Sequence, residues 1–324
     1  MSFRDIKGQD RAVSFLKSTV ESGRTAHAYI FFGPAGVGKR FAAIKFAMAI
    51  QCRGRERPCG ECVPCRKIEK NNHPDVYILG LNGLKKRDDE KGYVGIDEIR
   101  EAIRSIGLKP YESEKKVYII DGAEHMTEEA SNALLKTLEE PPSDSVLILI
   151  ASGLDRLLPT IVSRAQHLKF MPLGAGYITD ILTRFHKVEG SRARILSRIS
   201  CGSVGKALEY NREDFFRKRE NLIDALKKKD VLRIDFDGMP KDELKVQLEI
   251  MLAWYRDVLA AKAGLEDADM LVNSDCHEAI VQSAKDTEFG FLYEAVKRVI
   301  STGALLDQSA NVKLAMTALG VGLS

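Results

Sequence analysis

One seven-residue segment, GPAGVGK at 33–39, constrains this chain more than any other. It follows the apolar run 28–32, which favours a strand, and precedes an apolar segment with helical character. Glycines there let the backbone approach a phosphate, the amino terminus of the helix adds a positive dipole, and a lysine reaches the outer phosphates. The alternative is a plain glycine turn between strand and helix. In this context the segment predicts a phosphate-binding loop formed by Gly33, Gly36, Gly38 and Lys39.

The first half of the chain alternates short apolar runs with segments of helical periodicity. The runs lie at 28–32, 76–79, 117–120 and 146–150. This alternation predicts an α/β domain with a parallel sheet. We expect intervening helices at 96–106, where four isoleucines share one face, and at about 128–140, ended by Pro141 and Pro142. The segment 80–95 is rich in glycine and charge, which indicates an exposed, mobile loop.

After Pro172 the strand signals stop, and the remainder has the pattern of helices. We expect three parts: the α/β domain at 1–170, a small helical lid at 171–211 and a longer helical oligomerisation (collar) domain at 212–324. A broad apolar stripe suits either the core of a helical bundle or a surface for a partner's helices. The stripe consists of Leu244, Leu248, Met251, Leu252, Tyr255 and Leu259.

The residues around the phosphate loop depart from a working magnesium nucleotide site. Arg40 stands where a hydroxyl would ligate magnesium, and arginine has no acceptor. Asp121 ends an apolar run and suits a metal shell, but Gly122 follows it where an activating glutamate belongs. Glu124 is an alternative to that glutamate, although we expect a solvated side chain at a helix entry. The sequence thus predicts a degenerate nucleotide site that includes Asp121, with ATP or ADP binding left open and no magnesium expected.

Four cysteines form the pattern C-x6-C-x2-C-x2-C. They are Cys52, Cys59, Cys62 and Cys65. Four thiolates complete a tetrahedral zinc shell without a vacancy for water, so the pattern predicts a structural zinc site. Four free buried cysteines are the alternative, but the segment is polar and has no core of its own to bury them. Arg53, Arg55 and Arg57 raise the further alternative of a zinc-dependent nucleic-acid reader, although such a charge run favours a solvated face.

The charge balance restricts the possible partners. The 324 residues carry 49 basic and 46 acidic side chains, a net charge of +3, which does not indicate a nucleic-acid binder. The amino terminus has no apolar stretch of signal-peptide length, and the longest apolar run, 146–151, is too short to span a bilayer. The chain has six cysteines, four of which lie at 52–65, and such a small, clustered set is typical of a protein in a reducing compartment. We therefore expect a cytoplasmic protein.

Several motifs together resemble one known family. They are Gly8-Gln9, AHAY at 26–29, the four-cysteine insert, NALLKTLEEPP at 132–142 and LPTIVSR at 158–164. This combination resembles the bacterial DNA polymerase III clamp-loader family of the AAA+ class and, among its members, the delta-prime type most closely. The motifs cover the first domain, whereas the last third is similar only in length and helical character. The resemblance implies an AAA+ fold followed by the lid and the collar.

The resemblance also implies roles for individual residues. Ser163 and Arg164 match the first two residues of the family's Ser-Arg-Cys motif, with Ala165 in place of the cysteine. The arginine of that motif acts as an arginine finger in a neighbouring subunit's ATP site. Gly205 stands where active members have a nucleotide-sensing arginine in the lid, and Lys206 follows one position later. Ser152 lies at or beside a first sensor position, where its role is undecided.

The function that the resemblance implies is structural and allosteric. Such a subunit is a stator in a five-subunit ring with gamma/tau and delta subunits, without intrinsic activity, and supports ATP-driven loading of a sliding clamp onto primed DNA. The alternative is a gamma/tau-type ATPase, which Lys39 and Asp121 favour and which Arg40, Gly122 and Gly205 oppose. A zinc-containing DNA-binding module acting alone is a third possibility, against which the modest net charge argues.

Overall fold

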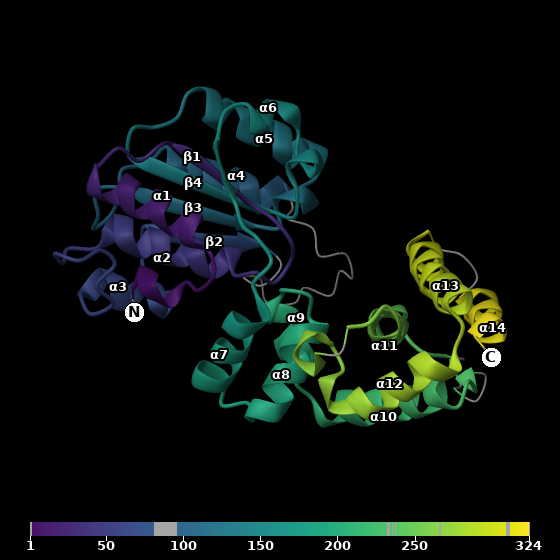
Figure 1. Cartoon of the computed structure of the whole chain (residues 1–324). Helices are drawn as coiled ribbons and strands as arrows, with labels where there is room; N and C mark the ends of the chain where they lie inside the picture. Colours follow the sequence, from purple (N-terminus) through teal and green to yellow (C-terminus); the bar gives the residue numbers. More distant parts are fainter. Residues whose placement is uncertain are drawn as a thin grey trace. The chain divides into compact units, whose positions relative to one another are not determined.

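The computed structural model of the protein describes residues 2–80, 96–231, 234, 236, 238–265, 267–308 and 312–323. These residues form two compact units (Figure 1). The first comprises Met1–Tyr177 and Gly202–Gly205, and the second comprises Ile178–Cys201 and Lys206–Ser324. The first unit contains a parallel sheet with helices, and the second is all helical in its described part. This confirms the predicted fold class.

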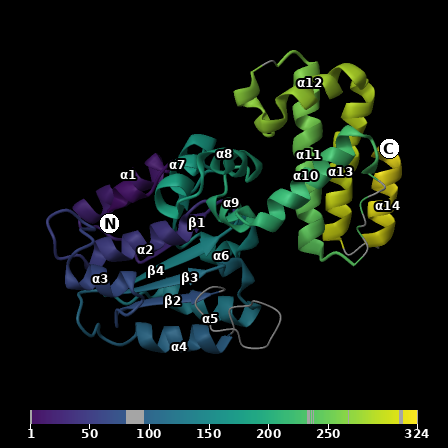
Figure 2. The ribbon, with the colours of Figure 1, turned by 90° about the horizontal axis from the view of Figure 1, so that it is seen from below.

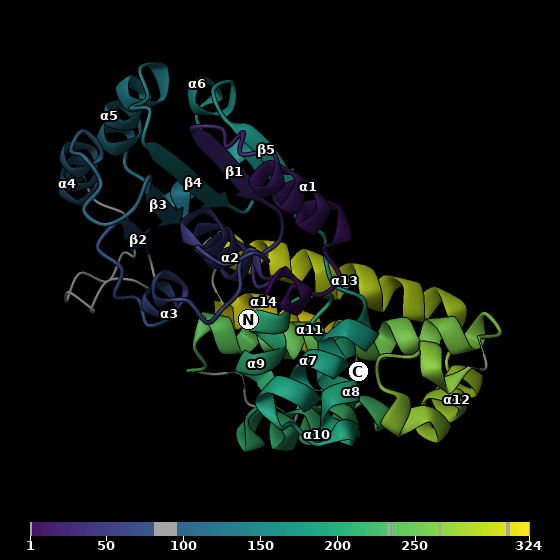
Figure 3. The ribbon, with the colours of Figure 1, turned by 90° about the vertical axis from the view of Figure 1, so that its left-hand side faces the viewer.

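The sheet of the first unit has five parallel strands. They are β1 (Ala28–Phe32), β2 (Val76–Gly80), β3 (Lys116–Asp121), β4 (Ser145–Ala151) and β5 (Gln166–Lys169). Their order is β2-β3-β4-β1-β5, which can be followed in Figure 3. The four strands predicted from the sequence are confirmed within about one residue. The sequence analysis did not predict β5, because only Leu168 of its four residues is buried. Because the strands are parallel, the segments that follow β1, β3 and β4 meet at one edge of the sheet.

Helices cover both faces of this sheet (Figure 2). They are α1 (Asp10–Glu21), α2 (Lys39–Gln51), α3 (Val63–Glu69), α4 (Ile96–Ile106), α5 (Glu128–Glu139) and α6 (Pro159–Val162), with short 3-10 turns at Phe3–Asp5, Ala123–His125 (η2) and Leu154–Arg156. Ile99 of α4 and Leu134 of α5 join the core on one face, with Ile30 of β1. On the other face, Phe46 of α2 contacts Tyr29 and Phe31. The helices predicted at 96–106 and 128–140 are confirmed, whereas the loop predicted at 80–95 lies almost entirely outside the described residues.

The remaining described chain consists of helices of unequal length. They are α7 (Ala175–His186), α8 (Gly190–Ile199), α9 (Val204–Tyr210), α10 (Glu213–Lys227), α11 (Lys241–Lys262), α12 (His277–Asp286), α13 (Phe289–Asp307) and α14 (Val312–Leu323), with 3-10 turns at Ala268–Met270 and Ser274–Cys276. Helix α11 packs against α10, α12 and α13, and α14 packs against α13. Of the apolar stripe on α11, Leu244, Leu248, Met251 and Tyr255 are buried. The stripe therefore builds the core of a bundle.

No helix in the described part of the chain combines the length and the apolarity needed to cross a bilayer.

A buried carboxylate fixes the segment that precedes β3. Asp75 is fully buried, and its oxygens accept the backbone N–H groups of Tyr111 at 2.6 Å, Glu112 at 2.9 Å and Ser113 at 3.0 Å. The side chain of Glu112 accepts a hydrogen bond from Lys67 of α3, a helix that also carries Cys65 of the cysteine cluster. Asp75 therefore joins the start of β2 to the segment that supports the cysteine insert.

Replacing Asp75 by alanine should destabilise the first unit strongly, because three backbone donors lose their acceptor. A hydrogen bond to a charged group contributes about 1.5–3 kcal/mol, so we expect the free energy of unfolding to fall by about 3–5 kcal/mol. Asp144→Ala is the matched control, since the side chain of Asp144 is exposed and only accepts from Ser143. Urea denaturation followed by circular dichroism measures both, and similar midpoints for the two variants would contradict the assignment.

Candidate phosphate-binding and metal sites

The segment 33–39 has the backbone conformation that its glycines predict. Gly33, Gly36 and Gly38 have φ angles of +143°, +72° and +96°, a region that other residues rarely adopt. A Cβ on Gly33 would lie 2.2 Å from the carbonyl oxygen of Phe170. Gly38 precedes the first residue of α2, so the first N–H groups of this helix lack intrahelical acceptors. The loop and the helix terminus together can bind an anion.

Lys39 lies at the centre of this loop. Its side chain is largely buried, and its ammonium donates to the carbonyl oxygens of Gly33 at 2.5 Å and Pro34 at 2.7 Å. An ammonium has three N–H donors, so one remains for a ligand. Burial lowers the pKa of Lys39, and the charges of Glu124 and Asp121 oppose this shift. The lysine is therefore held in place before any phosphate arrives.

Arg40 and Asp121 form an ion pair beside Lys39. The Nη1 atom of Arg40 lies 3.2 Å from Oδ2 of Asp121, and both side chains are partly exposed. Asp121 ends β3, whereas Arg40 is the second residue of α2. The guanidinium thus contacts the carboxylate that the sequence analysis assigned to a metal shell. Gly122, which follows, adopts a left-handed conformation and offers no side chain to the site.

Gln9 is a residue of this site whose role the sequence analysis missed. Its side chain donates to the carbonyl oxygen of Met171 at 2.7 Å and accepts from the N–H of Met171 at 3.0 Å. It also donates to the carbonyl oxygen of Val37 within the phosphate loop at 3.4 Å. Gln9 is buried and ties the loop to the chain that leaves β5. The Gly8-Gln9 motif was the available signal, but its partner Met171 is 162 residues away.

Glu124 differs from its expected solvated state. Its Oε1 accepts the N–H of Ser152 at 2.9 Å, and its Oε2 is buried without a hydrogen-bond partner among the described residues. The prediction of a solvated carboxylate is therefore wrong, because η2 turns this side chain toward the segment after β4. Ser152 contributes its backbone N–H to this contact.

Gly205 approaches the phosphate loop closely. Its N–H donates to the carbonyl oxygen of Gly36 at 3.1 Å. A Cβ on Gly205 would lie 3.0 Å from Cα of Gly36, and a Cβ on Gly36 would lie 2.2 Å from Oγ of Ser203. Two glycines are thus needed for this contact, and an arginine at position 205 would force them apart. Lys206 instead pairs with Glu249 of α11 at 2.5 Å.

The four cysteines of the insert lie together. The sulfur atoms of Cys52, Cys59, Cys62 and Cys65 all lie within 4.8 Å of one another. The Cys52 and Cys62 sulfurs are 3.9 Å apart, close to the edge of about 3.8 Å in a tetrahedral site with zinc–sulfur bonds of about 2.3 Å. The cluster can therefore hold a zinc ion with four sulfur ligands.

Backbone amides support these thiols. The N–H groups of Gly54 and Cys59 donate to the sulfur of Cys52 at 3.3 and 3.4 Å. The N–H groups of Cys62 and Glu61 lower the pKa of Cys59 to about 6. Burial raises the pKa of Cys52 and of Cys65. Zinc binding would therefore release protons from the two buried thiols and should strengthen as pH rises.

Arg164 lies apart from the phosphate loop. It follows α6 and precedes β5, and its Nη2 lies 2.9 Å from Oε1 of Glu139. Its Nη1 donates to the carbonyl oxygen of Thr160 at 3.0 Å. The side chain is about one third exposed. The structure therefore brings together the predicted loop residues, Asp121 and Arg40, but not Arg164.

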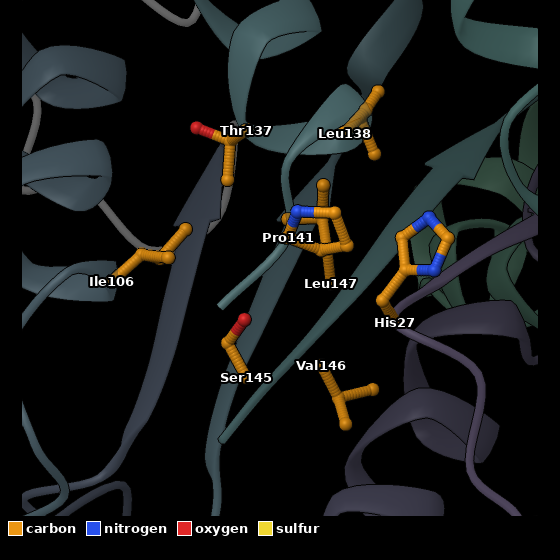
Figure 4. A pocket seen from close by; sticks show the side chains of 8 residues that line it. All are labelled: His27, Ile106, Thr137, Leu138, Pro141, Ser145, Val146 and Leu147. Atoms are coloured by element: carbon orange, nitrogen blue, oxygen red, sulfur yellow. The ribbon is translucent and has the colours of Figure 1, made fainter. Parts of the chain in front are cut away.

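A small cavity lies at the opposite end of the sheet from the phosphate loop, among His27, Thr137, Pro141 and Ser145 (Figure 4). Its volume is about 10 Å³, which is room for one water molecule. The cavity is too small for a nucleotide.

Comparison with known proteins gives two family matches. The family described as DNA polymerase III, delta subunit, matches residues 8–174, and its C-terminal domain family matches residues 213–319. The delta-prime subunit of DNA polymerase III from Bacillus subtilis is 34% identical over 94% of this chain and 93% of its own length. The chain belongs to this DNA polymerase III subunit family. Its delta-prime relative from Pseudomonas aeruginosa is 32% identical over 72% of this chain and 70% of its own length.

The delta-prime type is better supported than the gamma/tau type. The tau subunit from Bacillus subtilis is 31% identical over 72% of this chain but matches only 40% of its own length.

Among solved structures, a gamma-subunit-related protein from Thermotoga maritima covers 96% of this chain with 17% identity and a TM-score of 0.45. The clamp loader delta protein from Bacillus subtilis covers 96% with 11% identity and a TM-score of 0.34.

The cysteine cluster of this delta-prime family member should hold one zinc ion per chain. Cys62→Ser removes a ligand that the other three cannot replace, so we expect zinc content to fall toward zero and the melting temperature to drop. Elemental analysis of protein prepared without chelator measures the metal. Cys201→Ser is the control, because Cys201 is exposed and outside the cluster. A wild-type content near zero, or equal contents in both variants, would overturn the assignment.

Proposed function

We propose that this chain is a stator subunit of a bacterial clamp loader. It joins gamma/tau and delta subunits in a five-subunit ring, hydrolyses no ATP itself and offers Arg164 to ATP bound by a neighbouring subunit. Through the complex it supports loading of a sliding clamp onto primed DNA in the cytoplasm, as part of the DNA polymerase III holoenzyme. The observation that carries this proposal is the position of Arg164, which precedes β5 and lies apart from the chain's own phosphate loop.

The register of β1 and β5 keeps Arg164 away from the chain's own phosphate loop. These parallel strands pair from Tyr29 with Gln166 to Phe32 with Lys169. The phosphate loop follows Phe32, whereas Arg164 precedes Gln166, so the two lie at opposite ends of the paired residues. Strands rise about 3.3 Å per residue, which makes this separation roughly 10 Å or more along the strand axis. This position supports the proposal that Arg164 contacts ATP bound by a neighbouring subunit and not a ligand in the chain's own phosphate loop.

The contacts of Arg164 leave it available for such a role. β5 is an end strand of the sheet, and the partner Glu139 is about half exposed. Exposed ion pairs contribute only about 0–1 kcal/mol. A triphosphate offers more negative charge and a geometry that matches the planar guanidinium. Exchange of Glu139 for a phosphate of a neighbouring subunit is therefore favourable.

Three positions around the phosphate loop support the absence of intrinsic hydrolysis. Arg40 supplies no hydroxyl for magnesium, Gly122 supplies no carboxylate for the attacking water, and Gly205 supplies no arginine. Glu124 stands two positions after Gly122, in η2, and its Oε1 accepts the N–H of Ser152.

We assign 171–211 as a lid from the resemblance alone. Exposed apolar side chains support the assignment of 212–324 as an oligomerisation (collar) domain. On α13, Phe289, Tyr293 and Ile300 are each more than half exposed and are spaced by four and seven residues, which places them on one helix face. On α14, Leu314 and Val321 are exposed and seven residues apart. Such faces are suited to packing against helices of neighbouring subunits.

The cysteine cluster has a structural role in this proposal. Zinc held by Cys52, Cys59, Cys62 and Cys65 has no open coordination position, so it stabilises the insert and takes no part in the reaction.

Arg164→Ala in a reconstituted loader tests the proposal. An arginine finger contributes about 10³–10⁵ in rate at the ATP site that it faces. We therefore expect that site to stop contributing to DNA-stimulated ATP turnover, measured by phosphate release with clamp and primed DNA present.

Glu139→Ala is the matched control for this experiment. It removes the intrachain partner of Arg164 but keeps the guanidinium, so turnover should stay near the wild-type value. Unchanged turnover in Arg164→Ala would remove the proposed role. An equal loss in both variants would assign the defect to the intrachain ion pair instead.

A further inference from the structure

A cationic side chain of this protein occupies the place that magnesium takes in nucleotide sites of this type. A magnesium ion there is held by the hydroxyl that follows the lysine and by the acidic residue at the end of a strand. Here Arg40 follows Lys39, and its guanidinium lies 3.2 Å from the carboxylate of Asp121. One side chain therefore replaces the hydroxyl ligand and also pairs with the acidic ligand.

We infer that the phosphate loop binds a nucleoside diphosphate without a divalent cation, and that Arg40 provides the positive charge in place of magnesium. This inference goes beyond the proposed assembly role and does not depend on it, because it concerns binding by the isolated chain.

The loop retains enough donors for a diphosphate. The ammonium of Lys39 has used two of its three N–H groups, on Gly33 and Pro34. The guanidinium of Arg40 has five N–H groups, of which one donates to Asp121. The close contact with Gly205 uses the carbonyl oxygen of Gly36 and leaves the N–H of Gly36 for a phosphate.

The charges around the loop also favour a metal-free ligand. Lys39 and Arg40 bring two positive charges to the loop, and the guanidinium of Arg40 pairs with Asp121. A magnesium ion bound to Asp121 would stand beside the guanidinium, and two cations a few ångströms apart repel one another. The nucleotide without magnesium avoids this repulsion and gains hydrogen bonds to both cationic side chains.

Calorimetric titration of the full chain with ADP, in magnesium-free buffer and in magnesium, tests the inference. The magnesium-free buffer contains no chelator, because a chelator would also remove zinc from the cysteine cluster. We expect wild-type ADP binding to be at least as tight in magnesium-free buffer as in magnesium. Lys39→Ala should abolish this binding, which separates the loop from other basic surfaces. Arg40→Ala should weaken binding in magnesium-free buffer by about 10- to 100-fold, the effect of losing hydrogen bonds to a charged group.

Arg40→Ser supplies the sharpest comparison, because it restores a hydroxyl next to Lys39 and frees the carboxylate of Asp121 for a metal. This variant should bind ADP at least tenfold more tightly in magnesium than in magnesium-free buffer, the reverse of the wild type.

Three results would overturn the inference: tenfold tighter wild-type binding in magnesium, equal affinity of wild type and Arg40→Ala in magnesium-free buffer, or no wild-type binding at millimolar ADP. Thermal unfolding without ligand verifies that each variant folds. The metal dependence of the wild type needs no variant and decides the question even if a variant does not fold. None of these results affects the Arg164 experiment, which reads turnover by other subunits.

Discussion

The parallel register of β1 with its neighbours β4 and β5 is the constraint on which the rest of the structure depends. Because all five strands run the same way, the segments after β1, β3 and β4 meet at one edge. That edge gathers the phosphate loop, Asp121 and Ser152. The same register places Arg164, which precedes β5, toward the opposite edge. The strand direction therefore places the phosphate loop, which can bind an anion within this chain, at one edge of the sheet. It places Arg164, which we propose contacts another subunit, toward the other edge.

Two of the proposed departures from a working ATP site, Arg40 and Gly205, make a local contact. Arg40 pairs with Asp121, and Gly205 reaches the carbonyl oxygen of Gly36. Glu124 accepts from the segment after β4. The contact of Gly205 reaches the phosphate loop itself, and Arg40 contacts Asp121 beside it. The backbone conformation of the loop is therefore that of a phosphate-binding loop, whereas the loss of hydrolysis stays a proposal.

The sequence predicted the elements of the fold better than the contacts of the site. Strong apolar runs located β1 to β4, because a buried parallel strand needs apolar side chains on both faces. β5 lies at the edge and buries only Leu168, so its pattern is weak. The glycines, Lys39 and the four cysteines were recognisable because their spacing is local.

Long-range contacts could not be predicted from spacing. Gln9 and Met171 are 162 residues apart, and Arg40 and Asp121 are 81 residues apart. Glu124 was misassigned for the same reason, since its partner Ser152 lies 28 residues further along the chain. The division into a lid and a collar stays a proposal, as do the roles of Arg164 and of zinc.

We propose that this chain keeps a phosphate loop but does not turn ATP over. The decisive measurement is steady-state ATP hydrolysis by the purified, isolated chain in magnesium. We expect a rate no higher than that of Lys39→Ala. A measurable wild-type rate that Lys39→Ala abolishes would contradict it and would assign the chain to the hydrolysing gamma/tau type.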